Sequence, residues 1–249
     1  MKRQLLNLLA ILAAFGINIW SNLAPANGVT IGEISNTVYQ DVLITPANYA
    51  FAIWGMIYLS LISFAIYQAL PSQRHNPYLE QIGYLLVASS VAQIAWVFLF
   101  QYQFVFSSLV AMILILVPLL TIYLRLGIAY TEVSRTNRRL IHFPISIYFA
   151  WISVATIVNF ALTLYKFEWS GWGISPFVWT VVMLVIATII AIAANLLRED
   201  TTFLLVVLWA LIAIAVRHVN ILPLVTVAGG LAIILLILLL LRILNSRSI

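Results

Sequence analysis

Residues 82–125 read IGYLLVASSVAQIAWVFLFQYQFVFSSLVAMILILVPLLTIYLR. The stretch consists of two long apolar runs that meet at Tyr102 and Gln103, and no charged residue occurs in it before Arg125. Each run is about 20 residues long, and a helix of that length crosses the roughly 30 Å hydrocarbon core of a bilayer. The stretch therefore predicts two antiparallel transmembrane helices joined by a tight turn.

The composition of the whole chain agrees with this prediction. Of 249 residues, 64% are hydrophobic and 8% are charged, and the mean hydropathy is +1.11. A soluble domain carries roughly a quarter of its residues as charged side chains, so the chain is expected to be an integral membrane protein. The fold class is then all-α, a polytopic transmembrane helix bundle. Its eight predicted spans lie near 4–24, 48–70, 82–101, 104–125, 141–165, 176–197, 201–216 and 222–243.

The basic residues predict how these spans are oriented. With eight spans, ten of the twelve basic residues fall on one side of the membrane and only Lys166 and Arg217 fall on the other. Such an excess marks the cytoplasmic side, so both termini are predicted to face the cytoplasm, most simply at the cell (inner) membrane. The run at 201–216 is short enough to be re-entrant instead, but omitting it moves Arg242 and Arg247 across and weakens the asymmetry. The net charge is +5, and the basic residues lie at predicted helix ends. We therefore expect them to set topology and not to bind nucleic acid.

The first span allows a second interpretation. Lys2 and Arg3, the apolar run after them and the sequence Ala24-Pro25-Ala26 resemble a cleavable signal peptide. Polar or bulky residues interrupt the end of that run, which is also long enough to remain as a membrane helix. We expect the span to be retained, with cleavage as the alternative.

Polar and aromatic side chains recur at membrane depth in three spans, where they normally face the interior of a bundle. They are Trp54 and Tyr58 in the second span, Ser89, Gln93 and Trp96 in the third, and Tyr148, Trp151, Ala155, Thr156 and Asn159 in the fifth. Spacings of three and four residues place the members of each group on one helix face. They predict either a cavity walled by aromatic rings or close helix packing with hydrogen bonds between helices.

The fifth span reads WISVATIVN over residues 151–159, and this pattern resembles the fifth-helix signature of the TspO/MBR family of tryptophan-rich sensory and translocator proteins. In that family a tryptophan is followed four, five and eight residues later by alanine, threonine and asparagine. The second and third spans are similar to the family as well, through Pro46, Trp54, Gly55 and Tyr58, and through Gln93 and Trp96. The sequence departs from the family pattern at Asn48, Gln93 and Ile147, and the sterol motif after the fifth helix is not matched.

The resemblance implies a five-helix bundle over residues 1–165, with a pocket beneath the loop 25–47, and a C-terminal three-helix transmembrane extension over 166–249. It implies binding of flat hydrophobic molecules such as a porphyrin or sterol, by a sensor, carrier or regulator that can form homodimers. Such a ligand would not be a permanent cofactor, and the other expected partners are membrane lipids. The ligand-binding residues that the residue pattern and the resemblance together suggest are Trp54, Tyr58, Gln93, Trp96, Tyr148, Trp151, Ala155 and Asn159.

The sequence gives no sign of catalytic chemistry. It contains no cysteine and no HExxH, P-loop or GxSxG motif, and all seven acidic residues lie in loops or at predicted helix ends. We therefore expect neither a catalytic nor a metal site. A small-molecule transporter, with a path between the five-helix bundle and the last three spans, is the alternative function, and a lipid-processing enzyme is a more distant one.

Overall fold

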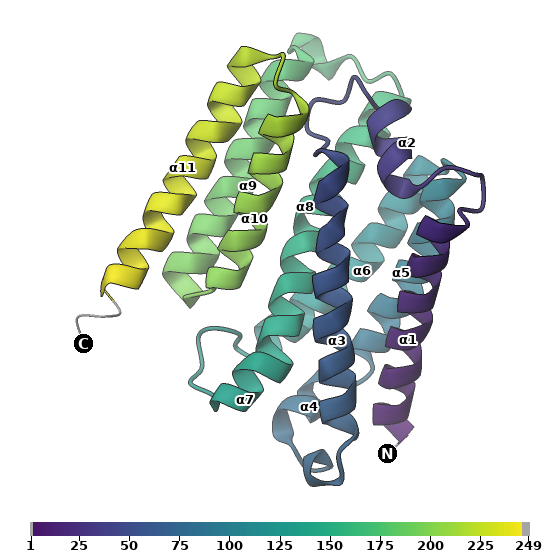
Figure 1. The fold of residues 1–249 in the computed structure, drawn as a ribbon, viewed down its shortest axis with the longest axis vertical. Helices are drawn as coiled ribbons and strands as arrows, with labels where there is room; N and C mark the ends of the chain where they lie inside the picture. Colours follow the sequence, from purple (N-terminus) through teal and green to yellow (C-terminus); the bar gives the residue numbers. More distant parts are fainter. Residues whose placement is uncertain (1, 246–249) are drawn as a thin grey trace.

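Long apolar helices build the protein, for which we describe a computed structural model covering residues 2–245 (Figure 1). The long helices are α1 (Lys2–Leu23), α3 (Ile53–Ala69), α5 (Leu85–Gln101), α6 (Val105–Arg125), α8 (Phe143–Lys166), α9 (Pro176–Arg198), α10 (Thr201–Arg217) and α11 (Leu222–Asn245). The short elements are α2 (Ile31–Thr37), α4 (Pro77–Ile82), α7 (Arg135–Asn137), the 3₁₀ turns η1 (Asn48–Ala52), η2 (Pro71–Gln73) and η4 (Gly171–Gly173), and the π-helical turn η3 (Arg138–His142).

The predicted all-α fold is confirmed, and each predicted span coincides with a helix. Within residues 2–245, six helical segments are long and apolar enough to cross a membrane. The other two apolar helices, α5 and α10, have 17 residues each, which is the lower limit for a crossing. The count of eight crossings therefore stays a prediction. α10 is nevertheless a single unbroken helix.

The turn between α5 and α6 is as tight as the sequence predicts. Gln103 adopts a left-handed conformation with φ of 59°, which an L-residue accepts only where the chain must reverse sharply. The amide of Phe104 donates a hydrogen bond of 2.9 Å to the carbonyl of Leu99, and this bond closes the end of α5.

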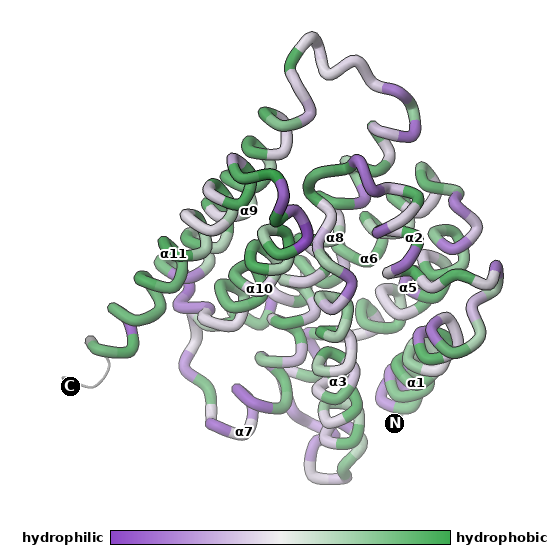
Figure 2. Tube along the Cα trace, turned by 45° about the horizontal axis from the view of Figure 1, so that its top comes forward, coloured by the Kyte–Doolittle hydropathy of each residue, from purple (hydrophilic) through white to green (hydrophobic). Residues whose placement is uncertain are grey.

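Hydrophobic side chains cover the outside of the bundle as well as its core. Along α11, Ile233, Ile237 and Leu241 are each about half exposed or more (58%, 51% and 53%). Figure 2 shows that hydrophilic residues gather in the loops and at helix ends, including α7, whereas the long helices are mainly hydrophobic. A soluble protein does not expose apolar surface on this scale, so these faces are suited to contact lipid.

The two groups of basic residues lie at opposite ends of the bundle. Most of the large group lies at the start of α1, in α7 and η3, and at the ends of α6, α9 and α11, toward the lower end of Figure 1. The ends of α8 and α10, which carry Lys166 and Arg217, lie toward the upper end. Arg247, which belongs to the large group, is outside the described residues. The charge separation is thus present in the fold, while its assignment to the cytoplasm stays a prediction.

Helix α8 is the central element. It lies between α3 and α10 in Figure 1 and also contacts α6. Its consecutive residues Ile145 to Ile152 are all buried, so the helix has no side that faces lipid over two turns. A helix that is apolar on every side is one that other helices surround.

α10 contributes to the same hydrophobic core as the first five long helices. At its start, the buried carboxylate of Asp200 accepts hydrogen bonds from the Tyr123 hydroxyl (2.9 Å), the Ser146 hydroxyl (2.6 Å) and the Phe203 amide (3.1 Å). Asp200 thus caps α10 and ties it to α6 and α8. This contact joins the two predicted parts, residues 1–165 and residues 166–249. Their division into separate units stays a prediction.

Replacement of Asp200 by alanine should destabilise the protein. The change leaves two buried hydroxyls without their acceptor and removes a helix cap, so the free energy of unfolding should fall by about 2–4 kcal/mol. Unfolding in detergent, followed by circular dichroism, measures this loss. Glu199→Ala is the matched control, because Glu199 makes a largely exposed ion pair with Arg242 and such pairs contribute about 0–1 kcal/mol. Equal stability of the two variants would contradict the assigned role of Asp200.

Candidate functional site

A small internal cavity lies where α2, η1, α3, α5 and α8 meet. Its volume is about 40 Å³. It is lined by Ile31, Ser35, Pro46, Phe51, Trp54, Trp96, Phe100, Trp151, Val154, Ala155, Val158, Asn159 and Leu162. Five of the eight residues suggested by the sequence therefore surround one space, namely Trp54, Trp96, Trp151, Ala155 and Asn159.

Aromatic rings form most of the walls. Trp54 stacks on Tyr58 with a distance of 5.5 Å between ring centroids, and Tyr148 approaches Trp54 edge-on at 6.0 Å. Tyr58 and Tyr148 thus stand behind the cavity wall and hold Trp54 in place. On the α5 side, Trp96 stacks on Phe100 at 5.2 Å. Aromatic pairs at these distances stabilise one another beyond the area they bury.

The amide of Asn159 joins three helices. Its Oδ1 accepts a hydrogen bond from Trp96 Nε1 in α5 (3.3 Å), and its Nδ2 donates to the Ser108 hydroxyl in α6 (3.1 Å). The predicted packing role is therefore present at this residue. The same contact aims the indole of Trp96 along the cavity wall, so packing and cavity formation use the same side chain.

Gln93 differs from the other suggested residues, because it is buried but lies outside the cavity lining. It is near the Tyr58 hydroxyl, which donates to the carbonyl of Ala14 in α1 (3.1 Å). Neither the oxygen nor the nitrogen of the Gln93 amide has a hydrogen-bond partner among the described residues. Gln93 is therefore a buried polar group outside the cavity wall, although an unpaired amide is unfavourable in an apolar environment.

The resemblance suggested a pocket beneath the loop 25–47, but the sequence reasoning did not name Ile31, Ser35 or Phe51, which close the cavity at that loop and at η1. Ile31 and Ser35 belong to α2, Pro46 precedes η1, and Phe51 lies in η1, where its ring meets Trp151 edge-on at 6.2 Å. We call residues 31–52 the cover. A signal for α2 was present in the sequence, since Thr30 and Glu33 form a capping box. The two hydrogen bonds from Thr30 to the Glu33 carboxylate lower the pKa of Glu33.

The C-terminal end of α10 holds this cover in place. The Arg217 guanidinium donates through Nη1 to the carbonyls of Ser35 (3.1 Å) and Pro46 (3.5 Å) and through Nη2 to that of Tyr39 (3.5 Å). In addition, Trp209 Nε1 donates to the carbonyl of Ala50 (3.1 Å). The cover is therefore attached to a helix from the C-terminal part of the chain.

The geometry limits what the cavity can do. No acidic or basic side chain lines it, and its lining consists mainly of aromatic and aliphatic side chains, which suit a flat apolar molecule. A site of about 40 Å³ admits water, whereas sites for larger ligands measure roughly 300–1,000 Å³. The structure thus presents the closed form of any such site.

Comparison with known proteins gives one result. A family model described as "TSPO-like protein" matches residues 4–242. No curated protein and no solved structure matches the chain. The family match begins in α1 and continues through α9 and α10 into α11, so the three C-terminal helices are part of the matched sequence. The multi-helix bundle with its lipid-suited surface agrees with this match, and the chain belongs to the TspO/MBR family as a multi-pass integral membrane protein.

Proposed function

We propose that the protein binds a flat hydrophobic ligand of the porphyrin or sterol class between Trp54, Trp96 and Trp151. It would then act as a sensor, carrier or regulator of that ligand. The observation that supports this function is the convergence of three tryptophans from three helices on one cavity. A wall of rings gives a large apolar contact area with little loss of side-chain freedom on binding.

Binding requires the cover to move, because the closed cavity is too small for such a ligand. The cover is held by hydrogen bonds from Arg217 and Trp209 and by apolar contacts. The walls formed by α3, α5 and α8 belong to the packed bundle and have less freedom. We therefore place the route of access beneath α2 and η1.

The first test is binding of protoporphyrin IX by the full-length protein in detergent. Replacing Trp54 and Trp151 together by alanine removes two ring contacts, and the dissociation constant should rise at least about tenfold. The Soret band of the porphyrin serves as the readout, because it does not depend on the number of tryptophans in the protein.

Two further variants make this test specific. Ala155→Leu fills the cavity instead of emptying it and should also weaken binding. The double variant Trp20→Ala with Trp172→Ala removes two tryptophans that are exposed and lie outside the cavity, and it should leave binding unchanged. If the wild type and the Trp54/Trp151 variant bind protoporphyrin equally, the proposed site is wrong.

The second test concerns the cover. Arg217→Gln removes the cationic donor that binds three carbonyls of the cover, so the open form should be more populated. Because apparent affinity scales with the fraction of competent protein, porphyrin should associate several-fold faster and bind at least as tightly. Lys166→Gln is the control, since it removes an exposed charge at the same end of the bundle. An unchanged association rate in stopped-flow measurements of the Arg217 variant would contradict the role of the cover.

Transport is the second candidate function, and one further cavity favours it. A space of about 270 Å³ lies between α8 and α9, lined by Tyr165, Trp169, Trp179 and Met183 among others. It lies at the junction between the five-helix part and the C-terminal helices, where the sequence suggested a path.

Vesicles that contain the purified protein test this candidate. If the path runs between α8 and α9, Met183→Trp should slow protoporphyrin flux at least several-fold without changing binding at the first cavity. Val182→Trp is its control, because Val182 lies outside the lining of the α8–α9 cavity. Wild-type flux no faster than that of protein-free vesicles would exclude transport of this ligand.

A further inference from the structure

A polar cavity of about 620 Å³ lies at the opposite end of the bundle from the cover. The π-helical turn η3 and the start of α8 form one wall, and the α9–α10 turn and the end of α11 form the other. Its lining is made up of Ile128, Ala129, Thr131, Arg138, Arg139, His142, Phe143, Ser146, Glu199, Asp200, Thr201, Thr202 and Arg242. We call it the arginine cavity. π-Turns within helices occur often at functional sites, because they displace side chains from the regular helix positions.

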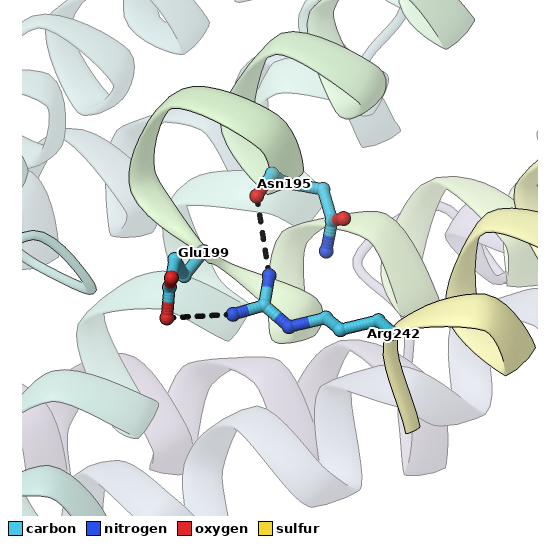
Figure 3. A network of polar contacts seen from close by, with 3 residues as sticks. All are labelled: Asn195, Glu199 and Arg242. Carbon is cyan, nitrogen blue, oxygen red and sulfur yellow. Dashed lines mark hydrogen bonds and ion pairs between the residues drawn. The ribbon is translucent and has the colours of Figure 1, made fainter. Parts of the chain in front are cut away.

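The acidic groups in this cavity already have partners. Arg242 donates to Glu199 Oε2 (2.8 Å) and to the carbonyl of Asn195 (3.1 Å), as Figure 3 shows. The carboxylate of Asp200 accepts the three hydrogen bonds described above. Moreover, the Arg198 guanidinium lies 5.4 Å from the ring centroid of Tyr123, one of the donors to Asp200. Both carboxylates thus have hydrogen-bond partners, and with three arginines against two carboxylates the lining keeps a net positive charge.

Two arginines of the lining have no such partner. Arg138 and Arg139 are exposed at the cavity and make no side-chain hydrogen bond or ion pair with the residues from 2 to 245. Both line the same cavity, so both guanidinium groups are available to an anion bound there. Arginine binds phosphate through two parallel N–H groups, and a phosphate group is therefore the ligand chemistry that this cavity favours.

An apolar groove continues from the arginine cavity. It has a volume of about 410 Å³ and shares Phe143 and Thr202 with that cavity. From there it follows α8 and α10 toward α3, and its other lining residues are Ala52, Ile53, Met56, Ile147, Leu205, Val206 and Trp209. Met56 and Leu205 are 56% and 45% exposed, so the groove is open on the lipid-suited surface. From Thr202 to Trp209 it extends about 10 Å along the helix axis.

We propose that the arginine cavity and this groove together bind an anionic phospholipid. Its phosphate lies against Arg138 and Arg139, and one acyl chain lies in the groove between α3 and α10. A basic pocket between membrane helices is suited to an acidic headgroup, and the continuous apolar groove selects a lipid over a soluble phosphate. The polar part of the site lies at the end of the bundle and the apolar part toward its middle, in the order that a lipid in a bilayer requires. This site is separate from the aromatic cavity and does not depend on the function proposed above.

The experiment uses the full-length protein in a nonionic detergent with two added lipids, dioleoyl phosphatidylglycerol and dioleoyl phosphatidylcholine. Binding is measured by native mass spectrometry and by the increase in unfolding temperature. We expect phosphatidylglycerol to bind at least about tenfold more tightly than phosphatidylcholine. Arg138→Gln with Arg139→Gln should abolish most of that preference. Arg125→Gln with Arg135→Gln removes the same charge from exposed positions at the same end, outside the cavity lining. This control should keep the preference for phosphatidylglycerol.

The groove is tested separately. Ala52→Trp fills it and should weaken phosphatidylglycerol binding at least several-fold. Leu59→Trp places the same ring on α3 outside the groove lining, so it should leave phosphatidylglycerol binding unchanged. This pair decides the question even if the double arginine variant fails to fold.

Three outcomes would overturn the proposal. Equal binding of the two lipids by the wild type excludes a headgroup site, and equal losses in the two double variants indicate general surface attraction. If inorganic phosphate competes fully and Ala52→Trp has no effect, the cavity binds a soluble phosphate and not a lipid.

Discussion

The structure depends on the burial of helix α8 among apolar helices, because every polar group on that helix then needs a partner inside the protein. Ser146 donates to Asp200, and Asn159 connects to Trp96 and Ser108. Ser153 donates to a carbonyl of its own helix. The first two of these contacts fix α5, α6 and α10 against α8. Consequently α8 forms a wall of the aromatic cavity, of the arginine cavity and of the groove between α3 and α10.

Most of the fold could be predicted from the sequence, since the length and apolarity of a span are local properties of the chain. The face of α8 that carries Trp151, Ala155 and Asn159 followed from their spacing of four residues, and all three line one cavity. The resemblance suggested that the loop 25–47 covers a pocket, but the attachment of this cover to α10 could not be predicted. Arg217 contributed only to the topology argument, because nothing in a sequence indicates which distant carbonyls a guanidinium will reach. The burial of Asp200 was also missed, since an acidic residue between two spans is normally exposed.

The two interpretations of the polar residues, packing and the proposed ligand binding, are compatible with each other. In the closed form the Asn159 amide is satisfied by Trp96 and Ser108, so it acts as a packing residue. Hydrogen bonds between membrane helices contribute only about 0.6 kcal/mol on average. A ligand that offers its own polar group to Asn159 can therefore replace such a bond at little cost. The closed cavity is consistent with ligand binding provided that the cover can open.

Helix α10 gives the C-terminal part of the chain a physical connection to both proposed sites. At one end Asp200 and Thr202 line the arginine cavity, and at the other end Arg217 holds the cover. Between them Trp209 lines the apolar groove with its ring and donates its indole N–H to Ala50 in the cover. Trp209 is thus shared by the groove and by the attachment of the cover. The three additional helices therefore do more than enlarge the bundle, because α10 supplies the contacts that close its aromatic cavity.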